Sequence, residues 1–198
     1  MTPFSVLHLC MGNICRSPMA ERLTVLAARA VAGDAADELL YVHSAGTGDW
    51  HVGEDMNPPA AEQIRRRGGD VSGFVCRTVA AADVAGSDLV LTATERQHRV
   101  VLSRWPAAAG KTFVLGQFGR LLREADLSAL PAATALSAEA VRARGEALVR
   151  AVDAARGGAR PLRTDDLDDP WGYEDAIFAR VADEIEASVR PLVAALLG

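Results

Sequence analysis

The sequence contains no run of apolar residues long enough to cross a membrane, since a spanning helix needs about 20 of them. The opening MTPFSVLHLC has no basic segment and no small-residue cleavage site, so it does not resemble a signal peptide. Cysteine is scarce, with only Cys10, Cys15 and Cys76 present. A low, odd count without a secretory signal predicts reduced thiols. We therefore expect a cytoplasmic protein with no membrane partner.

Positive charge is also limited. The 198 residues include 21 Lys and Arg against 26 Asp and Glu, which gives a formal net charge of −5. General nucleic-acid binders usually carry a basic surface, so this balance argues against a nucleic-acid partner. Hydrophobic residues make up 49% and charged residues 24%, which is the range of a globular domain rather than a disordered chain.

What the sequence does contain is an alternation of strand-like and helix-like segments. Four apolar segments rich in β-formers predict buried strands at residues 4–10, 38–46, 87–93 and 111–115. A helix-like segment follows each of them, and Ser17-Pro18 is expected to cap and open the first helix. The alternation predicts a single three-layer α/β domain over residues 1–198, with a four-stranded parallel sheet and helices on both faces.

The second half of the chain is less regular. Residues 138–157 place Val141, Leu148, Val149 and Val152 on one helical face, which predicts a further helix. The glycine-containing residues 157–166 predict a loop, and residues 173–198 predict a closing helix that Pro191 should kink. We find no internal repeat and no sign of a second domain.

The loop after the first strand carries the candidate chemistry. The stretch LCMGNICRSPMAE, residues 9–21, leaves an apolar strand at Cys10 and enters a helix after Arg16. A helix amino end and a neighbouring guanidinium both favour the nucleophilic thiolate. The loop amides can converge on an anion, Gly12 permits a tight turn, and the arginine fork fits two phosphate oxygens. Together these features predict a phosphate site with a nucleophile at its floor.

The cysteines of this sequence also fit simpler roles. An isolated cysteine that ends a strand is more often a small buried hydrophobe, but the combination of loop and helix residues argues against that here. A zinc site is a weaker alternative, because three scattered cysteines lack the paired spacing of structural zinc. We therefore expect no metal and no cofactor.

The stretch CMGNICRSPMAE resembles the phosphate-binding loop of the low-molecular-weight protein tyrosine phosphatases, with the pattern C-x5-R-[ST]-P. The resemblance implies that Cys10 is the nucleophile, that Arg16 binds phosphate, and that Ser17 steadies the thiolate. It implies that Asn13 holds the shape of the loop. The remaining loop positions implied to bind phosphate are Met11, Gly12, Ile14 and Cys15.

The same family uses an aspartate in a late D-P motif as general acid, because the leaving phenolate needs a proton as the P–O bond breaks. Here DDLDDPWGYEDA offers Asp169-Pro170, although spacing alone leaves Asp168 and Asp166 as alternatives. An acidic run by itself is more often a solvated loop. The implied pocket residues are Trp171 after this motif and Trp50 in HSAGTGDWHVG.

The resemblance implies one further loop support, Ser44 in HSAGT, which belongs to the hydrogen-bond network beneath the loop. Both residues also fit simpler roles: Ser44 can stabilise the turn at the end of the strand, and Trp50 can pack on the surface as an ordinary aromatic residue. The sequence also departs from the family. Phe74 stands where the family often has a histidine, Gly172 replaces a second aromatic residue, and the stretch at about 124–168 is longer than the family needs.

The resemblance implies hydrolysis of phosphotyrosine on protein substrates through a phosphocysteine intermediate. One alternative is arsenate reduction on the same fold, whose thioredoxin-linked form needs more cysteines than this chain provides. A second is protein-arginine phosphatase activity, whose enzymes carry threonine at the position of Ile14, where an apolar side chain favours a flat phenyl ring. A third, from another class, is a non-catalytic phosphate-binding module. The sequence does not predict an oligomeric state.

Overall fold

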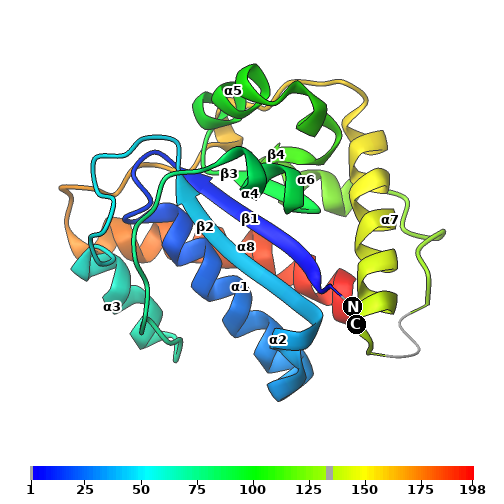
Figure 1. Ribbon diagram of the computed structural model, residues 1–198, viewed down its shortest axis with the longest axis horizontal. Coiled ribbons are helices and arrows are strands. Elements are labelled where there is room, and N and C mark those ends of the chain that lie inside the picture. Colours follow the sequence, from blue (N-terminus) through cyan, green and yellow to red (C-terminus); the bar gives the residue numbers. More distant parts are fainter. Residues whose placement is uncertain (1, 133–135) are drawn as a thin grey trace.

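The computed structural model describes residues 2–132 and 136–198. Its centre is a four-stranded sheet made of β1 (Phe4–Cys10), β2 (Leu40–Gly46), β3 (Leu89–Thr92) and β4 (Thr112–Val114) (Figure 1). The strand order is β2-β1-β3-β4, and each neighbouring pair is parallel. The sequence prediction of a parallel sheet in a single α/β domain is therefore confirmed.

Helices connect the strands, and several of them begin or end where the sequence predicts. The last of them, α8, runs through Pro191 as one helix, so this proline does not end it. The α-helices are α1 (Arg16–Ala32), α2 (Ala36–Leu39), α3 (Pro58–Arg66), α4 (Ala81–Gly86), α5 (Glu95–Arg104), α6 (Leu115–Glu124), α7 (Ala138–Arg156) and α8 (Asp175–Leu197). The described part of the chain also contains three 3-10 turns, η1 (Gly33–Ala35), η2 (Pro106–Lys111) and η3 (Arg163–Asp165).

The central strand β1 has all seven residues buried, because helices cover both faces of the sheet. Alternate residues of a strand point to opposite faces. Phe4 and Val6 accordingly join the larger core formed with α1, α6, α7 and α8, whereas Leu7 and Leu9 join the smaller core beneath α4 and α5. β1 therefore lies between the two cores, and its carboxyl end is at Cys10.

The stretch at about 124–168 contains the long helix α7 and the turn η3. The apolar face predicted for α7 is buried, with Val141, Leu148, Val149 and Val152 each at most 6% exposed. Helix α7 contacts α6, α8, η2 and β1, so it packs along one side of the domain (Figure 1). Helix α7 therefore adds to the larger core.

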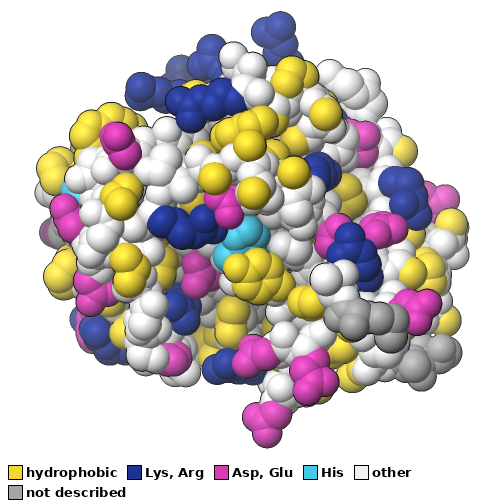
Figure 2. Space-filling model, in the orientation of Figure 1, with side chains coloured by type: hydrophobic (Ala, Val, Ile, Leu, Met, Phe, Trp, Pro, Cys, Tyr) yellow, Lys and Arg dark blue, Asp and Glu magenta, His cyan; other side chains and the backbone are white. Residues whose placement is uncertain are grey.

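The surface carries charges of both signs. Figure 2 shows acidic and basic side chains interspersed over most of one face, with Lys and Arg gathered at its upper edge, above α5. Among residues 2–132 and 136–198, no helix is long and apolar enough to cross a membrane. Within the same residues, no group of three or more His, Cys, Asp and Glu side chains is placed to hold a metal ion.

Candidate active site

The candidate nucleophile lies at the carboxyl end of β1. Cys10 is 2% exposed, and its Sγ atom accepts a hydrogen bond from Ser17 Oγ at 3.0 Å. The helix α1 begins at Arg16 with Cys15 as its N-cap residue, so the expectation that Ser17 caps the helix is wrong. The hydroxyl of Ser17 instead points back at the sulfur, where it can stabilise a thiolate by donating a hydrogen bond.

The loop between β1 and α1 is held by its carbonyl groups. The carbonyl oxygens of Cys10, Met11 and Ile14 accept hydrogen bonds from the amides of Thr47, Gly48 and Asn57, at 2.9–3.0 Å. By contrast, the amides of residues 11–15 donate to no acceptor among the described residues. A loop whose carbonyls are occupied and whose N–H groups are free is an anion-binding arrangement, here placed at the amino end of α1.

The turn in this loop depends on Asn13 rather than on Gly12. Asn13 has a φ of 54°, in the left-handed region that asparagine tolerates better than most residues. Gly12 is instead needed for space, because a Cβ atom there would lie 2.9 Å from Cδ2 of His51. The expectation that Gly12 provides the tight turn is therefore wrong. Glycine is needed there because the His51 ring leaves no room for a side chain.

The side chain of Asn13 forms the centre of a buried network. Its Nδ2 donates to Ser17 Oγ and to Ser44 Oγ, both at 2.9 Å, and its Oδ1 accepts from the backbone amide of Arg77 at 3.0 Å. Ser44 in turn donates to Glu21 Oε2 at 2.6 Å. The structure thus places Ser44 beneath the loop, linked through Asn13 to the hydroxyl that contacts the Cys10 sulfur.

Arg16 and Asp169 come together from opposite ends of the chain. Arg16 Nη2 donates to Asp169 Oδ2 at 2.6 Å, and Nη1 donates to the carbonyl oxygen of Leu167 at 3.3 Å. The arginine side chain is 7% exposed and that of Asp169 is 42% exposed, so the carboxylate sits at the open side of the pair. Its other oxygen accepts from the amide of Trp171 at 3.3 Å.

The two other aspartates considered for the acid role lie elsewhere. Asp168 is paired with Arg180 at 2.8 Å, and its side chain is 69% exposed. Asp166 accepts a hydrogen bond from the backbone amide of Glu95 at 2.7 Å. Of these three carboxylates, Asp169 is the one that lines the pocket with Cys10 and Arg16. The geometry therefore favours Asp169 over the alternatives that the sequence leaves open.

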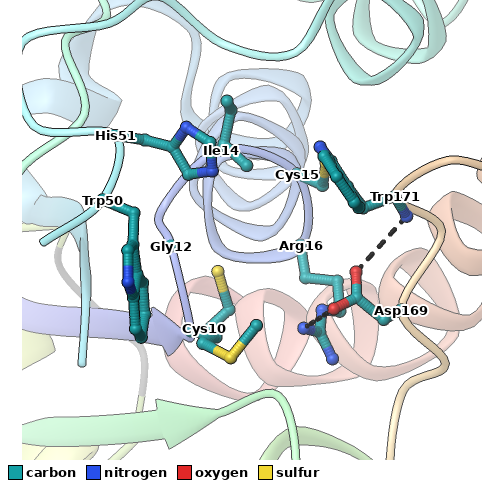
Figure 3. A pocket seen from close by; sticks show the side chains of 10 residues that line it. Cys10, Gly12, Ile14, Cys15, Arg16, Trp50, His51, Asp169 and Trp171 are labelled. Atoms are coloured by element: carbon teal, nitrogen blue, oxygen red, sulfur yellow. Dashed lines mark hydrogen bonds and ion pairs between the residues drawn. The ribbon is translucent and has the colours of Figure 1, made fainter. Parts of the chain in front are cut away.

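These groups line a pocket of about 260 Å³. Figure 3 shows Trp50 and Trp171 on opposite sides of the pocket, with Cys10 and Ile14 between them. Both indoles are more than half exposed, which leaves their faces open to a ligand. The Trp50 ring lies against Gly48, where a Cβ atom would be 1.8 Å from the indole. The space between the two rings suits a flat aromatic group.

Sequence reasoning did not single out His51, which also lines the pocket. Its Nδ1 is paired with Glu54 Oε2 at 2.8 Å, and its ring lies over Gly12. Sequence reasoning also missed Glu21 as a partner of Ser44 and Arg77 as a backbone partner of Asn13. All three residues lie within or near the motifs already recognised, but their contacts depend on the folded positions of separate segments.

Phe74, at the position where the resemblance implies a histidine, joins the larger core and is 7% exposed. The guanidinium of Arg22 lies over its ring, 5.9 Å from the centroid. This position therefore contributes apolar and cation–π packing rather than a hydrogen bond to the network beneath the loop.

The two other cysteines are buried beside the loop. Burial, together with the nearby Cys10 and Asp169, raises the pKa of the Cys15 thiol well above its ordinary value. Burial and the nearby carboxylate of Glu54 raise the pKa of Cys76 to about 11. The Cys76 thiol donates to the carbonyl oxygen of Asn13 at 2.9 Å, so it supports the loop from below. Both groups therefore remain protonated thiols near neutral pH.

Comparisons with known proteins agree with this geometry. The family model described as "Low molecular weight phosphotyrosine protein phosphatase" matches residues 5–150. The chain therefore belongs to this family. It is 33% identical to the low molecular weight protein-tyrosine-phosphatase Ptp of Acinetobacter johnsonii, over 58% of this chain and 73% of that protein. It is 35% identical to low molecular weight protein-tyrosine phosphatase A of Mycobacterium bovis, over 59% of this chain and 68% of that protein.

Solved structures show the same fold. A protein tyrosine phosphatase from Entamoeba histolytica covers 96% of this chain, and 95% of that chain is covered, with a TM-score of 0.68 and 20% identity. The YwlE arginine phosphatase from Geobacillus stearothermophilus covers 97% of this chain, and 92% of that chain is covered, with a TM-score of 0.65 and 21% identity. At these identities the likeness establishes the fold and leaves the substrate open.

Proposed function

We propose that this protein hydrolyses phosphotyrosine on protein substrates through a phosphocysteine intermediate at Cys10. The observation that carries the proposal is the pocket itself. It places a sulfur that accepts a hydrogen bond from Ser17 at the floor of a loop with free amides, between two exposed indoles. Membership of the family, by the match over residues 5–150, supports this assignment.

In the first chemical step, the Cys10 thiolate attacks phosphorus in line with the P–O bond that breaks. The loop amides and the Arg16 guanidinium stabilise the three equatorial oxygens of the transferring group. Ser17 donates to the sulfur, which lowers the cost of carrying the negative charge there before attack. The guanidinium and amides supply the positive potential that a metal ion provides in other phosphoryl transfers, so the proposed step needs no cofactor.

Asp169 supplies the proton that the departing tyrosine oxygen needs. In the structure its carboxylate is held by Arg16 at 2.6 Å. The phosphate of a substrate offers Arg16 a bidentate partner, so substrate binding frees the carboxyl group to face the leaving oxygen. In the second step the same group acts as base on the water that hydrolyses phosphocysteine, which regenerates the thiolate and releases inorganic phosphate.

The pocket walls support an aromatic phosphate ester as the substrate. Trp50 and Trp171 flank the opening, and Ile14 presents a branched apolar side chain between them. A phenyl ring can contact all three, whereas phosphoserine has no ring to place against them. We further propose that the protein acts in the cytoplasm on phosphotyrosine proteins. We also propose that the chain is one phosphatase domain, to which the stretch at about 124–168 is an addition.

Arsenate reduction is disfavoured by the state of the other thiols. A disulfide relay needs cysteines that exchange readily, and low thiol pKa values promote that exchange. Cys15 and Cys76 are both buried and have raised pKa values. Phosphoarginine is the closer rival, because a solved structure with this fold is described as an arginine phosphatase.

The experiment is a turnover comparison of three peptides of one sequence, carrying phosphotyrosine, phosphoarginine or phosphoserine, with arsenate reduction measured in parallel. We expect the highest kcat/KM with phosphotyrosine. The Ile14→Thr variant is the matched test of the pocket wall, and it should lose activity on phosphotyrosine relative to phosphoarginine. Preference of the wild type for phosphoarginine would reassign the substrate, while binding of phosphate without turnover of any peptide would favour a non-catalytic module.

A further inference from the structure

Beneath the phosphate-binding loop lies a second polar contact that the proposed mechanism does not use. His8, in the middle of β1, is 1% exposed and points toward α1, where its Nε2 lies 3.0 Å from Thr24 Oγ1. A histidine inside a buried strand must satisfy both ring nitrogens, because an unpartnered buried polar atom is costly. The Nδ1 atom of His8 has no hydrogen-bond partner among the described residues.

The hydrogen bonds of Thr24 determine which nitrogen of His8 carries the proton. Thr24 Oγ1 donates its single proton to the carbonyl oxygen of Ala20 at 2.7 Å. The hydroxyl oxygen can therefore only accept from His8, so Nε2 carries the hydrogen and Nδ1 is a bare acceptor. The ring is neutral, because burial, with a smaller contribution from His43, lowers the pKa of His8 to about 3.

The complementary donor is on Arg16. Its Nη1 and Nη2 atoms donate to Leu167 and Asp169, but its Nε–H group is buried and has no partner among the described residues. One small cavity, of about 10 Å³, is lined by both His8 and Arg16. That volume is about what one water molecule requires when polar partners surround it.

We propose that a single buried water bridges Arg16 and His8, accepting from the arginine Nε–H and donating to His8 Nδ1. Leu167 also lines the cavity, and its carbonyl oxygen, which takes only one long bond from Arg16, can accept the second proton of the water. The water then gives a hydrogen-bond partner to both the Arg16 Nε–H donor and the His8 Nδ1 acceptor, as buried waters commonly do for buried polar groups.

The bridge makes His8 a positioning residue for the phosphate-binding arginine. The backbone of β1 and the hydrogen bond to Thr24 hold the imidazole of His8 in place. Through the water, the imidazole in turn restrains the Nε atom of Arg16. The guanidinium then keeps its plane while a phosphate replaces Asp169 as the partner of Nη2 and Leu167 as the partner of Nη1. An arginine that is already ordered loses less conformational freedom on binding. This consequence rests on the proposed function, whereas the water bridge itself does not.

The bridge can be tested on the wild-type protein by NMR, with histidine and arginine labelled with ¹⁵N. We expect the His8 Nδ1 resonance to be that of an unprotonated, hydrogen-bonded nitrogen, and the Arg16 Nε–H proton to show a cross-relaxation peak with a long-lived water. A proton on Nδ1, a direct bond between the two side chains, or no water contact at Arg16 would overturn the proposal. None of these readouts requires turnover, so they stand apart from the proposed catalytic function.

The positioning role is tested by binding of inorganic phosphate to His8→Leu and His8→Asn. Leucine removes the acceptor, and losing one hydrogen-bonded link should weaken phosphate binding by roughly threefold to tenfold. KM should rise while kcat changes little, because the link acts on bound phosphate throughout the reaction. Asparagine restores an acceptor near the place of Nδ1 and should recover most of the affinity.

A control separates positioning from general loss of stability. Val6→Ala removes volume from the same face of β1, two residues away, without touching the cavity. It should lower stability and leave phosphate affinity unchanged. Equal weakening by Val6→Ala and His8→Leu, or no recovery with His8→Asn, would show that His8 serves only the core.

Discussion

Two substitutions of the buried Asn13 in the phosphate-binding loop distinguish the contribution of backbone strain to stability from that of hydrogen bonding. Asn13 is fully buried, has a φ of 54°, and makes three side-chain hydrogen bonds of 2.9–3.0 Å. Asn13→Ala removes all three and places a Cβ-bearing residue without local compensation in the left-handed region. Asn13→Gly removes the same hydrogen bonds but tolerates the backbone angle. The difference between the two variants therefore measures the strain.

The expected magnitudes follow from these contacts. Without Asn13 Oδ1, the backbone amide of Arg77 has no acceptor, which costs roughly 1–3 kcal/mol. Each of the two lost bonds to Ser17 and Ser44 contributes about 1 kcal/mol. The left-handed angle adds roughly 1–2 kcal/mol for alanine. We expect Asn13→Ala to lower the free energy of unfolding by about 4–7 kcal/mol, and Asn13→Gly to lower it by roughly 1–2 kcal/mol less.

Urea denaturation at neutral pH measures both values, and phosphate binding measures the shape of the loop in the surviving folded protein. Both variants should bind phosphate more weakly, because Asn13 links the loop to Ser17 and Ser44. A loss of stability below about 1 kcal/mol for Asn13→Ala, or phosphate affinity unchanged in both variants, would refute the reasoning that this residue holds the loop.

Three further predictions concern the acid, the buried histidine and the second loop cysteine. Asp169→Asn should slow aryl phosphates with poor leaving groups far more than those with good ones, while Asp168→Asn should show no such dependence; an equal loss across leaving groups would indicate a structural role. The lowered pKa of His8, about 3 against an ordinary 6.5, contributes stability that is complete above pH 6.5 and lost as the pH falls toward 3. By pH 5 this loss is roughly 2 kcal/mol, so unfolding free energies measured against pH should fall less steeply in His8→Leu, and parallel curves would contradict the assignment. Mild peroxide should oxidise Cys10 to a sulfenic acid, which the Cys15 thiol of the same loop converts to a disulfide with loss of water, slowly because its pKa is raised by burial. Cys15→Ala should then recover poorly on addition of a dithiol, and equal recovery would leave Cys15 with a packing role.

The strands and the phosphate-binding loop could be predicted because their signals are local. The apolar run of β1 and the spacing from Cys10 to Arg16 lie within one short segment, and the structure places them as the sequence indicates. The apolar face of α7 was predicted for the same reason. The helix cap was not, since the Ser17 hydroxyl serves the sulfur of Cys10 instead of the helix end.

Contacts between distant segments could not be predicted from the sequence. Spacing alone left three aspartates open, and the choice among them depends on Arg180 and the Glu95 amide, which hold Asp168 and Asp166. The sequence marked Gly12 as the turn, but the residue with left-handed backbone is Asn13, and a glycine is needed at position 12 because the ring of His51 approaches it. The role proposed for His8 depends on the cavity beside Arg16, which forms only in the folded chain.

In the proposed reaction, Cys10 carries the phosphoryl group during turnover, and every other role assigned to the pocket depends on it. The most direct test is acid quenching of the enzyme during reaction with a phosphotyrosine peptide, followed by intact-mass and fragment-mass analysis. We predict a fraction of protein heavier by one phosphoryl group, with the modification on Cys10, and no such species in Cys10→Ala. Turnover retained by Cys10→Ala, or a phosphoryl group found on another residue, would contradict this role for Cys10.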